Sequence, residues 1–159
     1  MERVEFASAI KGIKNPARVV MAIVQDETGK VNPITLEWFM RTSIAPPMFA
    51  ISVGHSRYSH DCLQSFRYFN LCYPSREMAA AVLHCGTASG RDSDKLKDSG
   101  LSWFKGRLAG LPIIREAAAN FECKLISQIR SGDHTIFTGE VKYSWLEAGR
   151  EPLLAEHLQ

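Results

Sequence analysis

The chain has 159 residues, of which 45% are hydrophobic and 23% charged, and its formal net charge is +2. This length favours a single domain spanning residues 1–159 that can bury a sizeable core. The nearly balanced charge argues against nucleic acid or a membrane as partner. The longest apolar run is far shorter than the roughly 20 residues of a membrane helix, and the N-terminus lacks a signal-peptide pattern. We therefore expect a cytoplasmic protein.

The first third of the chain is typical of antiparallel strands joined by short turns. After an irregular lead-in at residues 1–16, a continuous apolar run covers Val19–Val24. A second β-rich run covers Lys30–Ile44, and a third covers Met48–Val53 after the break at Pro46-Pro47. Short connections of this kind favour an antiparallel sheet over βαβ units.

Pro33 constrains the second run, because proline cannot donate a ladder hydrogen bond. The strand must therefore be bulged at Pro33 or lie at a sheet edge. A bulge leaves backbone groups free, and such places often seat a ligand. We expect the ligand site to lie near this residue.

The rest of the chain predicts short helices between further strands. In chain order we expect a helix at His60–Ser65, a strand at Tyr68–Tyr73, a helix at Arg76–His84, a short helix around Lys95 that ends at Ser99-Gly100, and strands at Asn120–Arg130 and Thr135–Trp145. Ser59, Ser75, and either Asp92 or Ser93 are the expected N-caps. The runs Trp103–Leu108 and Leu111–Ile114 are ambiguous, and the tail 146–159 carries little signal. About six strands with inserted helices indicate a small antiparallel barrel with helical additions.

Several common sites are excluded by the absence of their motifs. The sequence has no dinucleotide-binding G-x-G-x-x-G, no Walker A loop, no H-E-x-x-H and no G-x-S-x-G. No metal site is expected, because the metal-capable group His55, His60, Asp61 and Cys62 has no second pair of ligands elsewhere. Four irregularly spaced cysteines predict reduced, mostly buried thiols at Cys62, Cys72, Cys85 and Cys123.

Two loops carry the parts of an anion site. The segment Ser89–Lys95 offers two cations, a glycine, hydroxyls and a helix start, and Gly54–Ser59 repeats the pattern after the third strand. Backbone N–H groups at a helix start and a guanidinium fork both suit an anion. The alternative is that both loops are solvated turns, with their cations paired to Asp92 and Asp94.

Five motifs in order resemble one known family. The stretches N-P-I-T-L-E-W, I-A-P-P-M-F-A-I-S-V, R-Y-S, H-C-G-T-A-S-G-R-D-S-D-K-L, and F-E-C-K-L followed by G-D-H-T-I-F-T-G-E-V are similar to those of the flavin reductase-like family of FMN-binding split barrels. The resemblance is strongest to the branch that includes flavoredoxins, and it runs from about Pro16 to Val141. It implies a six-stranded antiparallel split β-barrel of Greek-key type, with short helices inserted between the strands.

The resemblance also implies a flavin site drawn from four segments. Second-strand residues would line the flavin, namely Asn32, Pro33, Ile34, Thr35, Trp38 and, towards the end of the run, Ser43. A loop near the phosphate and ribityl chain corresponds to Arg57, Tyr58 and Ser59. A positively charged loop corresponds to Ser89, Gly90, Arg91 and Lys95, and a hairpin histidine near the ring corresponds to His134.

The residue types agree with this assignment. FMN needs cations at its phosphate, hydroxyls and amides along its ribityl chain, and an apolar wall at its ring. Arg57 and Arg91 suit the phosphate because their planar forks match its oxygens. Trp38 can stack on the ring. Lys95 can stabilise negative charge on the reduced ring, unless it is exposed to solvent or paired with Asp94.

The implied activity is that of an FMN-dependent oxidoreductase, with FAD less favoured, in which NAD(P)H donates hydride to the flavin and no side chain acts as acid or base. Two alternatives stay open: an electron carrier without a nicotinamide site that is served by a redox partner protein, and a binding module that holds flavin or another planar ligand such as haem. The resemblance implies a homodimer with flavin near the interface. Relatives carry an aromatic-rich tail where this sequence has only Ala155–Gln159, so we expect an aromatic cover on the flavin to be absent or replaced.

Overall fold

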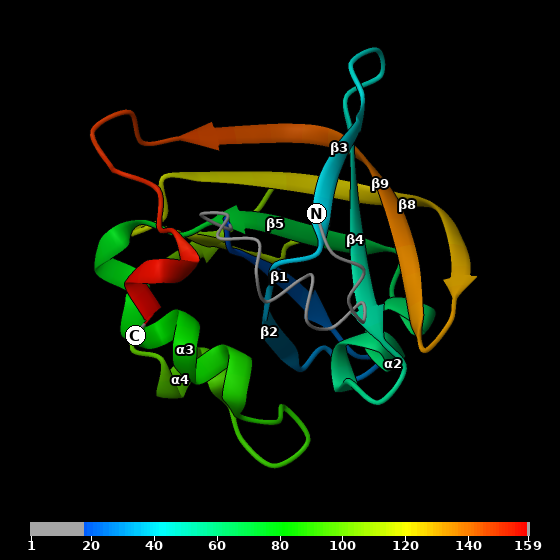
Figure 1. Cartoon of the computed structure of the whole chain (residues 1–159), viewed down its shortest axis with the longest axis horizontal. Helices are drawn as coiled ribbons and strands as arrows, with labels where there is room; N and C mark the ends of the chain where they lie inside the picture. Colours follow the sequence, from blue (N-terminus) through cyan, green and yellow to red (C-terminus); the bar gives the residue numbers. More distant parts are fainter. Residues whose placement is uncertain (1–17, 159) are drawn as a thin grey trace, which may run out of the picture.

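The computed structural model describes residues 18–158, so the predicted lead-in lies outside the described residues. A seven-stranded antiparallel sheet with the strand order β2-β1-β5-β8-β9-β4-β3 dominates the fold and curves on itself (Figure 1). Its strands are β1 (Val20–Gln25), β2 (Val31–Leu36), β3 (Phe39–Ser43), β4 (Met48–Gly54), β5 (Tyr68–Tyr73), β8 (Ala119–Ser131) and β9 (His134–Leu146). A two-stranded ribbon of β6 (Trp103–Lys105) and β7 (Pro112–Ile114) resolves the two ambiguous runs as short strands. The mainly β antiparallel barrel is confirmed, although its two edge strands leave it open.

The predicted count of six strands is wrong, because the run Lys30–Ile44 forms two strands instead of one. β2 pairs with β1 and β3 pairs with β4, so the chain changes partners at Glu37-Trp38. β2 is an edge strand, and Pro33 lies opposite Ile23 without a register shift. The edge position expected for Pro33 is therefore correct, and the alternative of a bulge there is wrong.

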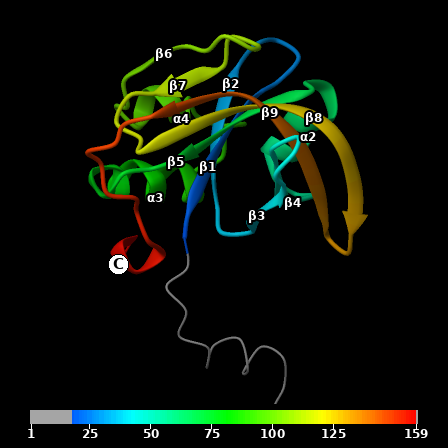
Figure 2. The same ribbon diagram turned by 90° about the horizontal axis from the view of Figure 1, so that it is seen from above.

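Short helices cover two sides of the sheet (Figures 1 and 2). They are α2 (Tyr58–Ser65), the 3-10 turn η1 (Arg76–Met78) that leads into α3 (Ala79–Thr87), α4 (Lys95–Asp98), and the 3-10 turn η2 (Ala155–Leu158). Ser75 occupies the predicted N-cap position of η1 without a side-chain hydrogen bond, whereas the N-cap of α2 is Arg57 and not the predicted Ser59. The N-cap of α4 is Asp94 and not the predicted Asp92 or Ser93, because the Asp94 carboxylate accepts a hydrogen bond from the Lys97 amide at 3.2 Å. The stop predicted at Ser99-Gly100 is confirmed, since Gly100 has a φ of +67° that suits glycine.

Two hydrophobic clusters lie on opposite faces of β1. Val20, Ala22 and Val24 point into the barrel, whereas Met21 and Ile23 point outward to α3, α4 and the C-terminal segment. Side chains alternate along a strand, so covering both faces requires the unbroken apolar run seen in the sequence. Full burial of each such side chain contributes about 1.5–3 kcal/mol. The outer cluster thereby fixes α3 and α4 beside β2.

The long β8–β9 hairpin has the predicted turn at Gly132-Asp133 and brings His134 opposite Gly54 of β4. All four cysteines are buried and free, as predicted. Among residues 18–158, no helix has the length and apolar character needed to cross a membrane.

Candidate functional site

Two adjoining hollows lie beside β2 and share Ile34, Arg57 and Gly86 in their walls. The first, with a volume of about 180 Å³, is formed by β2, the Ser56–Ser59 segment and the Cys85–Lys95 segment. The second, about 220 Å³, is formed by the end of β2, Trp38 and the β4 and β9 ends. Twelve of the fourteen sequence-predicted residues line one of them: Asn32, Ile34, Thr35, Trp38, Arg57, Tyr58, Ser59, Ser89, Gly90, Arg91, Lys95 and His134. The other two do not, since Pro33 is buried within β2 and Ser43 ends β3 away from both hollows.

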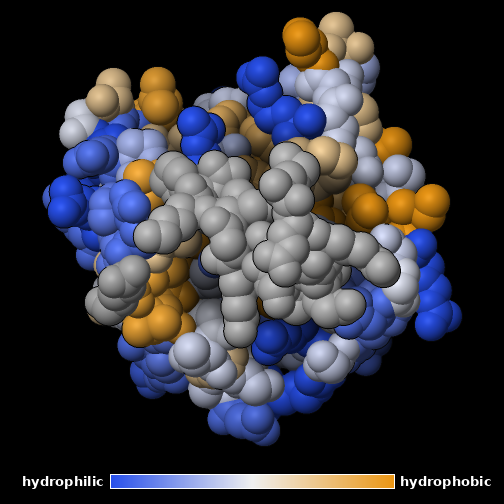
Figure 3. Space-filling model, viewed as in Figure 1, coloured by the Kyte–Doolittle hydropathy of each residue, from blue (hydrophilic) through white to orange (hydrophobic). Residues whose placement is uncertain are grey.

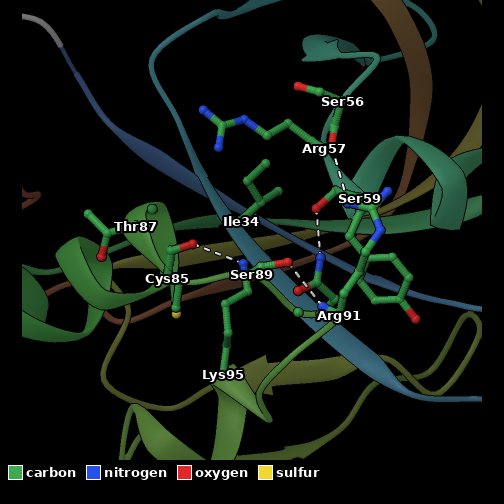
Figure 4. Close-up of a pocket in the computed structure, with 14 residues that line it drawn as sticks. Ile34, Ser56, Arg57, Ser59, Cys85, Thr87, Ser89, Arg91 and Lys95 are labelled. Carbon is green, nitrogen blue, oxygen red and sulfur yellow. Dashed lines mark hydrogen bonds between the residues drawn. The ribbon is translucent and has the colours of Figure 1, made fainter.

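Three cationic side chains line the first hollow. Arg57 and Lys95 enter it on opposite sides of Ile34 (Figure 4). Arg91 is already engaged, because its Nη2 lies 2.7 Å from Asp61 Oδ2 and its Nη1 donates to the Ser56 carbonyl at 3.2 Å. The predicted alternative, in which Asp92 and Asp94 neutralise these loops, is wrong. The partner of Arg91 is Asp61, and Asp94 caps α4.

Lys95 is buried, with only 3% of its surface exposed. Its Nζ donates to the carbonyl of Cys85 at 2.9 Å, and among the described residues no carboxylate lies within ion-pair distance of it. Burial, the largest cause, lowers the pKa of Lys95. A buried ammonium without a counter-ion is costly, and an anion bound in the hollow would relieve that cost.

Asn32 presents an unsatisfied acceptor to the same hollow. Its Nδ2 donates to Ser59 Oγ at 2.7 Å, but its Oδ1 is buried without a hydrogen-bond partner. Gly90 passes so close that an added Cβ would lie 2.1 Å from this oxygen. Buried polar groups are normally hydrogen-bonded. The free oxygen therefore fits a ligand that donates a hydrogen bond, such as a ribityl hydroxyl or a flavin ring N–H.

Asp26 holds Tyr58 in the wall of the first hollow. Its carboxylate accepts the Tyr58 hydroxyl at 2.5 Å and also accepts from Thr28 and the Lys30 amide. The Tyr58 hydrogen bond is the largest cause that lowers the pKa of Asp26 to about 2, and the same bond raises the pKa of Tyr58 to about 12. Lys30 and Arg91 also make cation–π contacts with the Tyr58 ring.

The Asp26→Asn variant tests this support. A carboxyl whose pKa is lower in the folded chain stabilises it at pH above the unfolded value of 3.8, and this contribution disappears as the pH falls towards 2. We expect the unfolding free energy of the wild type to fall between pH 4 and 2 more steeply than that of Asp26→Asn, with chemical denaturation as the measurement. An Asp92→Asn control should retain the wild-type slope. Parallel curves for the wild type and Asp26→Asn would contradict this role.

The second hollow is aromatic on one side. Trp38 is 61% exposed and stacks on the ring of His134, with centroids 4.7 Å apart and planes tilted by 39°. Asp133 Oδ1 lies 2.7 Å from Nδ1 of His134 and orients that ring. Thr35 Oγ1 donates its hydrogen to the Val82 carbonyl at 2.6 Å, so this hydroxyl can only accept a hydrogen bond from a ligand. Trp38 is thus a surface residue and not part of the core.

The sequence reasoning missed the residues that α3 contributes. The end of this helix packs on β2, where a Cβ on Gly86 would lie 3.3 Å from Thr35 Cβ. This brings Cys85, Gly86, Thr87 and Ala88 into the first hollow. The glycine that follows two residues after the predicted helix Arg76–His84 is the available signal in the sequence.

The protein-family model of the flavin reductase like domain matches residues 12–157 of this chain. An uncharacterised protein of Archaeoglobus fulgidus is 32% identical over 70% of this chain, which spans 63% of that protein. The NADH-dependent FAD reductase of Streptomyces globisporus is 30% identical over 76% of this chain and 66% of its own length. A crystal structure of an FMN-binding protein from Thermus thermophilus superposes with a TM-score of 0.78 at 30% identity, over 86% of this chain and 74% of that one.

Proposed function

This chain belongs to the flavin reductase-like domain family, and from that membership we propose that it is an FMN-dependent oxidoreductase that transfers electrons from NADH or NADPH to a second acceptor. The observation that carries the proposal is the pair of adjoining hollows, one cationic and one aromatic, with Ile34, Arg57 and Gly86 common to both. A cofactor with a phosphate at one end and a planar ring at the other matches this arrangement.

In this proposal the phosphate binds in the first hollow and the ring lies towards the second. Arg57 and Lys95 bind the phosphate, while Asn32 Oδ1 accepts a hydrogen bond from the ribityl chain or ring edge. The Trp38–His134 pair provides the aromatic wall.

The bound flavin would supply the hydride and electron transfer. Arg57 and Lys95 would hold its phosphate, and Trp38 with His134 would contact its ring. None of them is assigned as a general acid or base. Two proteins similar to this chain support the proposal: one is an NADH-dependent FAD reductase and the other an FMN-binding protein.

Anaerobic stopped-flow mixing of the flavin-loaded protein with NADH and with NADPH tests the activity. We expect one of the two nucleotides to bleach the flavin absorption band. If neither nucleotide bleaches it while a chemical reductant does, the nicotinamide step is contradicted, and an electron carrier served by a redox partner protein becomes the better description.

We also propose that the chain is a homodimer. The exposed Trp38 and Met40 and the partly buried Ile136 line a shallow hollow on β3, β4 and β9, and the exposed Ile129 of β8 lies opposite Ile136. Apolar surface also gathers at the projecting β3–β4 hairpin and along the edge near β8 (Figure 3). Large exposed apolar patches commonly mark protein interfaces.

Light scattering coupled to size-exclusion chromatography tests this assembly. We expect a mass of twice the 17.8 kDa of the chain. Met40→Lys should reduce the mass to that of a single chain, because burying an unpaired ammonium in an apolar interface is costly. Leu83→Lys, which places the same charge on an exposed apolar residue of α3 away from this face, is the control. A wild type that elutes as a monomer at micromolar concentration would refute the proposal.

A further inference from the structure

A hollow larger than either hollow of the proposed flavin site lies apart from that site. It has a volume of about 880 Å³ and lies at the barrel mouth formed by β3, β4, β5, β8 and β9. Small-molecule sites commonly have volumes of about 300–1,000 Å³. Only Glu37 lines both this hollow and the second hollow of the flavin site, so the Glu37–Phe39 link divides them.

Four aromatic side chains form the wall of this cavity. Tyr73 makes edge-on or tilted contacts with Phe39, Phe49 and Phe121, with ring centroids 5.7–6.2 Å apart. Phe39, Tyr73 and Phe121 pack against the barrel core but are only partly buried. Their remaining apolar surface faces the cavity, where a planar apolar ligand would gain burial.

The cavity also carries net positive charge. Arg18 and Arg41 line it together with a single carboxylate, that of Glu37. Within residues 18–158 neither guanidinium forms an ion pair. Burial raises the pKa of the Tyr73 hydroxyl, and the charges of Arg18 and Arg41 oppose that shift, so both cations act on the polar end of Tyr73.

From this combination we propose that the cavity is a second binding site, which takes a small planar aromatic carboxylate. The aromatic rings contact the flat body of the ligand, and Arg41 with Arg18 binds its carboxylate. A guanidinium matches a carboxylate through two parallel hydrogen bonds, whereas a neutral alcohol of the same shape offers no such match. The two guanidinium groups and the single carboxylate leave a net charge of one positive unit in the cavity, so a monoanion is the complementary ligand.

Isothermal titration calorimetry of the full chain with 2-naphthoate tests the site, with 2-naphthalenemethanol as the neutral analogue. We expect one naphthoate per chain and an affinity for the alcohol that is weaker by about tenfold or more. Arg41→Gln should weaken naphthoate binding to the same degree, whereas Arg130→Gln, an exposed arginine of β8, should not. Ser144→Trp fills the cavity mouth without removing a charge and should abolish binding.

Saturation with FMN separates this site from the flavin site, because naphthoate should bind equally well to flavin-loaded protein. Competition between the two ligands would overturn the proposal, as would equal affinity in Arg41→Gln and Arg130→Gln. Absence of binding at millimolar naphthoate would also overturn it.

Discussion

Gly90→Ala is expected to weaken flavin binding by at least about tenfold and to destabilise the protein by about 1–3 kcal/mol, the usual cost of overpacking. The new Cβ would lie 2.1 Å from Asn32 Oδ1 and 2.9 Å from Tyr58 Cδ1. Neither neighbour yields easily, because Asn32 is hydrogen-bonded to Ser59 and Tyr58 to Asp26. The loop must instead move outward, which breaks the hydrogen bond from Lys30 to the Gly90 carbonyl and opens the hollow.

Gly149→Ala is the matched control for this prediction. A Cβ at Gly149 meets no atom within 4 Å, and its backbone is not in the left-handed region. Flavin titration and chemical denaturation should therefore leave this variant close to the wild type. If Gly90→Ala bound flavin with wild-type affinity, the close approach of this loop to Asn32 would not be part of the binding site.

Lys95→Met is expected to shift flavin affinity and apoprotein stability in opposite directions. Removing a buried ammonium that has no counter-ion among the described residues should raise the thermal midpoint of the apoprotein. The same change removes a charge-assisted bond to the cofactor phosphate, which is worth about 1.5–3 kcal/mol, so flavin affinity should fall by about 10–150-fold.

The exposed Lys97 on the same short helix is the control, because Lys97→Met keeps the helix and changes the same residue type. Lys97→Met should change neither the flavin affinity nor the thermal midpoint of the apoprotein. A Lys95→Met protein that is less stable without flavin, yet binds flavin as tightly as the wild type, would show that Lys95 is a structural residue and not a cofactor ligand.

Much of the barrel was predictable because its signals are local. The continuous apolar run of β1 indicates a strand that is covered on both faces. Gly132-Asp133 indicates a hairpin turn, and Pro33 indicates an edge strand. The division of the second β-rich run was not predictable, since Glu37-Trp38 contains no turn former. The break arises because β2 and β3 pair with different neighbours, which is a tertiary property.

The same difference between local and tertiary signals applies to the candidate site. The family resemblance correctly indicated that the Gly54–Ser59 and Ser89–Lys95 loops meet beside β2. Pattern alone could not show the burial of Lys95, because lysine is usually a surface residue and its partner is a carbonyl at the end of α3. Nor could it show that Asp26 supports Tyr58 across 32 residues of sequence. Local sequence rules carry no information about contacts of this kind.

Comparing the affinities of the apoprotein for FMN and for riboflavin, which lacks the phosphate, tests the central claim most directly. If Arg57 and Lys95 form a phosphate site, FMN should bind at least about tenfold more tightly than riboflavin, and this difference should disappear in an Arg57→Gln, Lys95→Met double variant. Equal affinity of the wild type for the two flavins would contradict the assignment of the cationic hollow.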